Sequence, residues 1–257
     1  MKKINQAKSN FLEWNNQVLV SSIKKIDFNI LLITILDALF YFLSGYMVIF
    51  WLQRIQAKML SFNLPADIGV LGVERTQQLV AEAKAFYYLV VFSFILLLIA
   101  IIFLASIAKG IIWAKITKTK IRFALISKFL GLNLIWMGFW FVVVFLVSWL
   151  VEPTMAPILM AILAILGLYF TNALYTIFMK EQKISSIIKA VKIGITKVHL
   201  FLLPYTVILL LLFVLLRLIK FVNIGYFRIL TGLVIIVYFA VIRYYVSTLV
   251  LEVEKAG

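Results

Sequence analysis

The sequence contains no cysteine, a single histidine and only ten acidic residues in 257 positions. The absence of cysteine excludes disulfides, thiolate metal sites and cysteine nucleophiles. His199 has no neighbouring acid or second ligand, and one imidazole alone makes a poor metal site. No HExxH motif, Walker loop or glycine-rich nucleotide fingerprint occurs, and no carboxylate pair is placed to bind the Mg²⁺ of diphosphate chemistry. We therefore expect a protein that is not an enzyme, with no catalytic residue, metal or cofactor.

Charge of either sign is also scarce, at 14% of residues, whereas 65% of residues are hydrophobic. A soluble domain of this length holds roughly a quarter charged residues. The net charge of +15 could suggest nucleic acid, but the lysines and arginines gather beside the ends of apolar runs. There they orient a protein in a bilayer and attract anionic lipid. The composition therefore predicts a membrane protein and excludes nucleic acid as a partner.

Six apolar runs are each long enough to cross a hydrocarbon core of ~30 Å as a helix. Helix is the expected state, because the runs lack the in–out alternation of barrel strands. We predict an all-α membrane protein in which residues 1–257 form one domain, a bundle of six transmembrane helices. The predicted spans are 28–52, 86–108, 131–151, 156–179, 200–222 and 226–250.

The distribution of lysine and arginine predicts the orientation of these spans. Alternate connecting segments hold 17 and 7 basic residues, and Arg243 lies inside the last span. Cytoplasmic segments carry the excess of basic residues. Both termini are therefore predicted to lie in the cytoplasm, with the protein in the cell membrane. The basic segments are 1–27, 109–130, 180–199 and 251–257.

The longest segment on the opposite side, 53–85, predicts a helical hairpin that protrudes outward. Residues 53–60 can continue the first span, and 74–85 have good helix formers that run into the second. Pro65 and the glycines at 69 and 72 break the helix between them.

Segment 183–198, KISSIIKAVKIGITKV, has the clearest amphipathic pattern in the sequence. Such a helix lies in the membrane interface with its lysines toward anionic headgroups. Segment 110–130 and the N-terminal segment show weaker forms of the pattern, so we expect basic amphipathic interfacial helices on the cytoplasmic side. The predicted apolar face comprises Ile184, Ile187, Ile188, Val191, Ile195 and Val198. The predicted contacts with anionic lipid are Lys183, Lys189, Lys192 and Lys197.

These three segments also suggest an internal repeat of one interfacial helix followed by two spans. Residues Lys120–Asn133 (KIRFALISKFLGLN) align with Lys183–Thr196 (KISSIIKAVKIGIT), matching Lys-Ile at the start and Gly131 with Gly194.

Asp37 is the one acidic residue deep inside a predicted span, and an ionisable group in hydrocarbon normally finds a partner inside the bundle. Arg243 and Asn172 lie at similar depths, so Asp37, Asn172 and Arg243 are predicted to form a polar layer. Two interpretations remain open. The layer is either a proton- or ion-responsive site or headgroup pocket, or a buried pair that fixes the register of the helices.

The order of elements resembles that of uncharacterised six-helix prokaryotic membrane proteins, which are similar to the membrane domain fused to some glycerophosphoryl diester phosphodiesterases. The resemblance rests on KISSIIKAVKIGITKVHLFLLP, a basic amphipathic helix that runs into a span, and on the connection at 110–130. The catalytic domain of those enzymes is missing here. The resemblance therefore implies a layout, and neither an activity nor site residues.

Two functions are consistent with the sequence. The first is a non-enzymatic membrane scaffold or modulator whose partners are the lipid bilayer, its anionic headgroups and other membrane proteins. The alternative is a small transporter or channel that uses Asp37, Asn172 and Arg243. Transporters usually have broken spans and more polar lining residues than this chain shows, so we favour the first.

Overall fold

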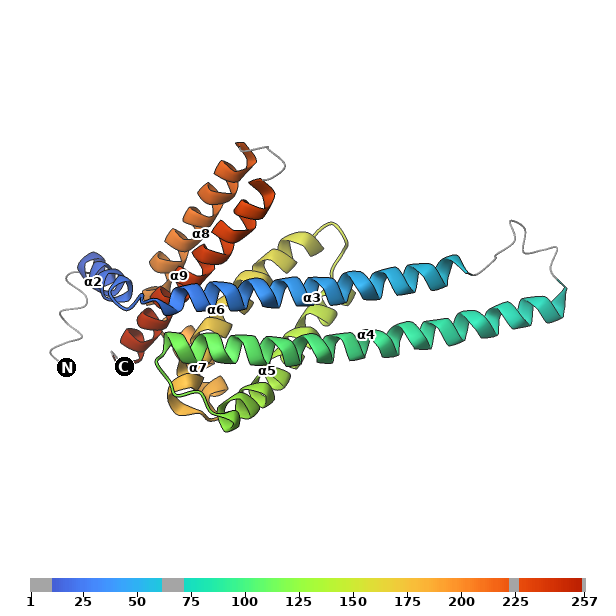
Figure 1. Ribbon diagram of the computed structural model, residues 1–257, viewed down its shortest axis with the longest axis horizontal. Helices are drawn as coiled ribbons and strands as arrows, with labels where there is room; N and C mark the ends of the chain where they lie inside the picture. The colour runs from blue at the N-terminus through green and yellow to red at the C-terminus, as the bar shows by residue number, and fades with distance from the viewer. Residues whose placement is uncertain (1–10, 62–71, 222–226, 256–257) are drawn as a thin grey trace. The chain divides into compact units, whose positions relative to one another are not determined.

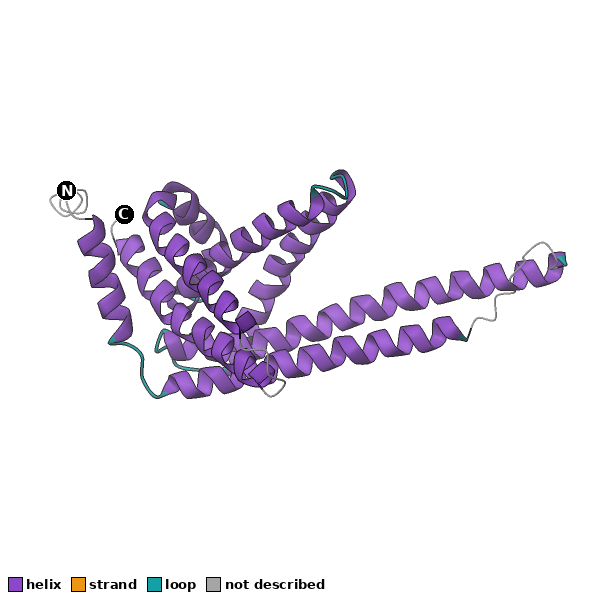
Figure 2. Cartoon of the chain, turned by 90° about the horizontal axis from the view of Figure 1, so that it is seen from above, coloured by secondary structure: helices purple, strands orange, loops and turns teal. Residues whose placement is uncertain are grey.

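The computed structural model describes residues 11–61, 72–221 and 227–255, and within these ranges every regular element is an α-helix (Figures 1 and 2). The all-helical prediction is confirmed. A helix satisfies its backbone hydrogen bonds within one segment, as an apolar run in lipid requires. The helices are α2 (Phe11–Ile23), α3 (Asn29–Leu60), α4 (Val73–Ile116), α5 (Phe123–Leu150), α6 (Ala156–Glu181), α7 (Ser186–Thr196), α8 (Val198–Phe221) and α9 (Phe227–Lys255).

Six of these helices are long and apolar enough to cross a membrane. They are α3, α4, α5, α6, α8 and α9, and each contains or closely matches one of the six predicted spans. This confirms the layout of a multi-pass membrane protein. The helices are mostly longer than the spans, because hydropathy detects the apolar stretch of a helix and not its polar ends.

The interfacial helix predicted at 110–130 is wrong. Residues up to Ile116 belong to α4, and residues from Phe123 belong to α5, so the segment holds two helix ends joined by a short connection. Ile112, Trp113 and Ala114 are almost completely buried. They therefore pack inside the protein and do not lie on a membrane surface.

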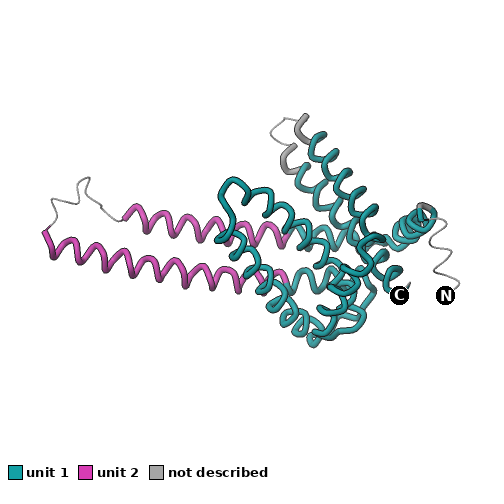
Figure 3. Tube along the Cα trace, turned by 180° about the vertical axis from the view of Figure 1, so that it is seen from behind, with its two compact units in different colours: residues 1–38, 106–257 teal, residues 39–105 magenta. Residues whose placement is uncertain are grey.

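The contacts divide the chain, for which the sequence predicted a single domain, into two compact units (Figure 3). Unit 1 comprises residues 1–38 and 106–257, and unit 2 comprises residues 39–105. Unit 2 is a pair of helical segments in which Trp51 Nε1 donates a hydrogen bond to Ser93 Oγ over 3.0 Å. As predicted, residues 53–60 continue α3 and residues 74–85 belong to α4. Pro65 and Gly69 lie outside the described residues.

The core of unit 1 is built around the C-terminal half of α6, where every residue from Ala173 to Met179 is buried. Helices α5, α7 and α9 all pack against α6. Polar side chains join the helices inside this core: Tyr175 donates to Asn133 Oδ1 over 2.6 Å, and Asn133 donates to Ser106 Oγ over 2.9 Å. Buried hydrogen bonds of this kind fix the register of helices where apolar contacts alone do not.

Helix α7 packs against α6 through small residues spaced four apart. Ser186, Ala190 and Gly194 are buried along this face, and Tyr169 of α6 donates a hydrogen bond to the Gly194 carbonyl over 2.8 Å. A Cβ atom at Gly194 would lie 2.6 Å from the ring of Phe170. Small residues allow the two helix backbones to approach closely, and at Gly194 a side chain larger than hydrogen would meet the ring of Phe170.

The proposed repeat agrees with the structure only in part. In both aligned segments the helix begins three residues after the lysine, at Phe123 and at Ser186. However, α5 continues for 28 residues whereas α7 ends after 11. Gly131 also has nothing within 4 Å of its Cβ position, unlike Gly194. The two glycines therefore have different packing environments. A shared ancestry of the two segments stays a prediction.

The substitution Gly194→Ala should lower the thermal unfolding temperature of the protein in detergent, followed by tryptophan fluorescence. Forcing a methyl group into a packed contact costs about 1–3 kcal/mol, which outweighs the gain in helix propensity. Gly131→Ala is the matched control, because open space surrounds that position. Equal unfolding temperatures for the two variants would contradict the packing described here.

Candidate functional site

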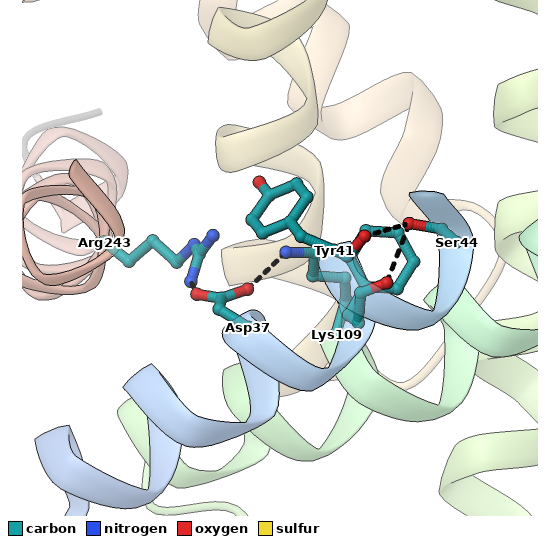
Figure 4. Close-up of polar contacts among 6 residues, drawn as sticks. Asp37, Tyr41, Ser44, Lys109 and Arg243 are labelled. Carbon is teal, nitrogen blue, oxygen red and sulfur yellow. Dashed lines mark hydrogen bonds and ion pairs between the residues drawn. The ribbon is translucent and has the colours of Figure 1, made fainter. Parts of the chain in front are cut away.

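A single carboxylate bridges two cations in unit 1 (Figure 4). Lys109 Nζ of α4 lies 2.5 Å from Asp37 Oδ1 of α3. The guanidinium of Arg243, on α9, donates a hydrogen bond to Asp37 Oδ2. Each carboxylate oxygen therefore takes part in one ion pair. Asp37, Lys109 and Arg243 are called the charge cluster below, and they join three helices.

The carboxylate of the charge cluster is completely buried, whereas the Lys109 side chain is 15% exposed. Asp37 is 0% exposed and Arg243 is 9% exposed. An apolar group lies on the same three helices, comprising Ile33, Ile112, Ile116, Ala240 and Tyr244. A carboxylate in such surroundings stays ionised only with cations beside it. Two cations on one acid meet this requirement.

The structure joins two of the three residues predicted to form the polar layer. Asp37 and Arg243 form an ion pair. Asn172 lies on α6, where its carbonyl accepts a hydrogen bond from Thr176 over 2.9 Å. Within the described residues, no hydrogen bond or ion pair links Asn172 to Asp37. Lys109 takes the third position instead.

Sequence reasoning missed Lys109 because the second span was predicted to end at residue 108. The helix in fact continues for eight residues beyond that point. The signal was the apolar run Ile111 to Ala114, which follows Lys109 and Gly110 and indicates that Lys109 is internal to the helix. Lysine extends far enough to reach a neighbouring helix from a position near a span end.

A second group of charges lies where α6, α7 and α9 meet. Lys189 Nζ donates to Glu254 over 2.6 Å and also to Glu181, and Lys180 pairs with Glu254 at 3.0 Å. Hydrogen bonds to Glu181 and Glu254 raise the pKa of Lys189 above its ordinary value. Lys189 was predicted to contact headgroups, and the structure shows its ammonium group bound to carboxylates of the protein.

The remaining residues predicted to contact lipid lie on or beside α7. Lys183 and Lys192 are exposed, and Lys197 is half-buried. Three isoleucines of the predicted apolar face are also exposed: Ile184 by 52%, Ile188 by 74% and Ile195 by 63%. Exposed isoleucines next to exposed lysines are typical of a helix at a membrane interface.

The sequence did not predict a pocket of about 370 Å³ on the connection between α4 and α5. Three basic side chains line it together with Gln182 from the end of α6. The lining residues are Lys120, Arg122, Ala124, Leu125, Lys128 and Gln182. This group is called the basic pocket below. The sequence showed the basic residues, but not that the end of α6 closes the space between them.

Two left-handed residues end the helices beside the basic pocket. Lys118 has φ 56°, the Thr119 amide donates to the Ala114 carbonyl at 2.8 Å, and the Lys118 amide donates to the Lys115 carbonyl at 3.2 Å. This pair of bonds is the Schellman motif. Gln182 has φ 55°, and its amide donates to the Phe178 carbonyl. Thr119 Oγ1 also donates to the Met179 carbonyl over 3.3 Å, which ties the connection to α6.

Comparison of the chain with protein-family models, with curated proteins and with solved structures gives no match. In the part of the chain that the structure describes, no three His, Cys, Asp or Glu side chains gather as a metal site would require. The function is therefore argued from the charge cluster, α7 and the basic pocket.

The substitution Asp37→Asn should strongly destabilise the protein, because it leaves Arg243 and Lys109 buried without a carboxylate. Breaking a buried pair in this way costs about 3–5 kcal/mol. Thermal unfolding in detergent measures the effect. The triple variant Asp37→Leu, Lys109→Met, Arg243→Met removes all three charges and should recover most of the lost stability. A triple variant as unstable as Asp37→Asn would show that the charges do more than satisfy one another.

Proposed function

We propose that this chain is a non-enzymatic, multi-pass protein of the cell membrane that binds anionic lipid headgroups on its cytoplasmic face and acts there as a scaffold or modulator. The observation that carries the proposal is the outward surface of α7. It combines exposed Ile188 and Ile195 with exposed Lys192 on a helix whose opposite side packs against the bundle, and Lys183 is exposed just before this helix begins.

In this proposal the packed side and the exposed side of α7 have different roles. The small residues Ser186, Ala190 and Gly194 hold the helix on α6. Ile188 and Ile195 are then free to enter the boundary between headgroups and acyl chains. Lys183 and Lys192 provide charge at the level of the phosphates, where each basic residue contributes about 1 kcal/mol of attraction to an anionic surface.

The predicted orientation supports the same assignment. The basic residues near α7 belong to the set of segments that carries 17 of the 25 lysines and arginines. Anionic lipid is enriched in the cytoplasmic leaflet, so the positive-inside rule and lipid attraction place α7 on the same side. A partner membrane protein that is itself surrounded by anionic lipid would be drawn to this surface in turn.

The charge cluster gives the transport alternative no support. Asp37 is fully buried, and each of its two oxygens is bound to a cation. A transport site needs a carboxylate that exchanges its partner for a substrate or a proton, and it needs access to water. In this proposal the cluster is structural and fixes the register of α3, α4 and α9.

The double variant Lys183→Gln/Lys192→Gln should weaken the binding of phosphatidylglycerol to the detergent-solubilised protein by about 30-fold, from the loss of two headgroup attractions of about 1 kcal/mol each. Native mass spectrometry counts the bound lipids during a titration, with phosphatidylcholine as the neutral comparison. Binding of phosphatidylcholine should not change.

The matched control is Arg54→Gln/Lys84→Gln, which removes the same charge from exposed positions on α3 and α4. These residues belong to the predicted outward segment, so their loss should leave phosphatidylglycerol binding as it was. If both double variants lose binding equally, net charge alone attracts the lipid and the role assigned to α7 is incorrect.

A further inference from the structure

The basic pocket gathers three cations and no carboxylate in a space of about 370 Å³, at the lower end of the roughly 300–1,000 Å³ range of small-molecule sites. Within the described chain, Lys120, Arg122 and Lys128 form no ion pair. The nearest acid in sequence to Gln182 is Glu181, which accepts hydrogen bonds from Lys189 and Ser186. All three cations are exposed side chains along the pocket, and an anion bound between them would be attracted by each.

The local backbone separates basic from apolar side chains around the pocket. Residues 119–122 lie outside regular structure, and Arg122 is extended with φ −136° and ψ 153°. Side chains two apart in an extended chain point the same way. Lys120 and Arg122 therefore both line the pocket, whereas Ile121 and Phe123 are 40% and 90% exposed. An almost fully exposed phenylalanine directly beside the pocket indicates an acyl chain as its neighbour.

The pocket is also held in place before any ligand arrives. The Schellman motif at Lys118 and the left-handed turn at Gln182 fix its two ends, and Thr119 ties them together. Lys128 lies four residues after Ala124 on α5, so both face the pocket from one side of the helix. The small side chain of Ala124 leaves the space that a larger residue would fill.

We infer that the basic pocket binds the phosphomonoester of an anionic lipid headgroup. A phosphomonoester carries about −1.5 to −2 charges and three acceptor oxygens, which suits three cations and the amide of Gln182. A phosphodiester such as phosphatidylglycerol carries one charge and suits them less. The inference rests on the proposed function, in which this face of the protein binds anionic lipid, and assigns one lipid class to one place on it.

The test uses the full-length protein in detergent, titrated with phosphatidic acid, phosphatidylglycerol or phosphatidylcholine and analysed by native mass spectrometry. The wild-type protein should bind phosphatidic acid several-fold more tightly than phosphatidylglycerol. Lys120→Gln/Lys128→Gln should reduce phosphatidic acid binding about 10-fold or more, from the loss of two charge-assisted contacts. Phosphatidylglycerol binding should change little, because in the proposed function that lipid is bound at α7.

Ala124→Leu tests the pocket without changing any charge. It fills the space between the cations and should abolish the preference for phosphatidic acid. Ser127→Leu is the matched control, since Ser127 is exposed on the same helix and does not line the pocket. Thermal unfolding of each variant shows whether it is folded. A folded Ala124→Leu protein that keeps the preference would overturn the inference.

A further measurement with a soluble anion distinguishes the binding of a lipid headgroup from the binding of free phosphate. Inorganic phosphate is added to the wild-type protein, and the unfolding temperature and the displacement of phosphatidic acid are measured. Stabilisation by phosphatidic acid but not by inorganic phosphate supports the lipid assignment. Stabilisation by inorganic phosphate alone, lost in Ala124→Leu, overturns the lipid assignment in favour of a soluble phosphate.

The two proposals can fail separately. If the pocket variants lose phosphatidic acid binding while Lys183→Gln/Lys192→Gln changes nothing, the pocket inference stands and the role of α7 fails. If the α7 variant alone reduces lipid binding, the proposed function stands and the pocket inference is overturned.

Discussion

An ionised carboxylate within a membrane-spanning helix has to be accompanied by positive charge, and much of unit 1 is arranged to meet this condition. Asp37 draws Lys109 from α4 and Arg243 from α9 to the same point. Elements separated by more than 200 residues in sequence are thereby joined, because both cations bind the same carboxylate. Around α6 the register of the helices is fixed separately, by buried hydrogen bonds such as that from Tyr175 to Asn133.

The fold was largely predictable from the sequence, because lipid leaves an apolar run few alternatives. A stretch of about 20 apolar residues has to form a helix, and the observed helices α6 and α8 match the predicted spans to within two residues at each end, whereas α5 begins eight residues before its predicted span. The limits of α4 were less predictable. Its last turns contain Lys109 and Lys115, which a hydropathy profile reads as a connection, yet Ile112 and Trp113 between them are buried. This explains both the wrong interfacial helix at 110–130 and the missing third member of the charge cluster.

Helix α7 shows a second limit of sequence patterns. Four of the six residues predicted to share one apolar face are exposed, namely Ile184, Ile188, Ile195 and Val198, whereas Ile187 and Val191 pack against the core. The same pattern did not reveal that the packed face consists of Ser186, Ala190 and Gly194, since small residues have little weight on a hydrophobicity scale. Inside a membrane protein, close approach of backbones replaces hydrophobic burial as the main attraction between helices. The sequence also did not reveal the basic pocket, because one of its lining residues is Gln182, which lies 54 residues beyond Lys128 in the chain.

The length of α4 has a consequence for how much of it a bilayer can cover. With 44 residues, this helix is about 66 Å long, roughly twice the hydrocarbon thickness of ~30 Å. Even a strongly tilted span therefore leaves close to half of the helix outside the hydrocarbon. Its polar N-terminal stretch contains Glu74, Gln77 and Glu82, so this part of the helix is suited to contact with water or lipid headgroups.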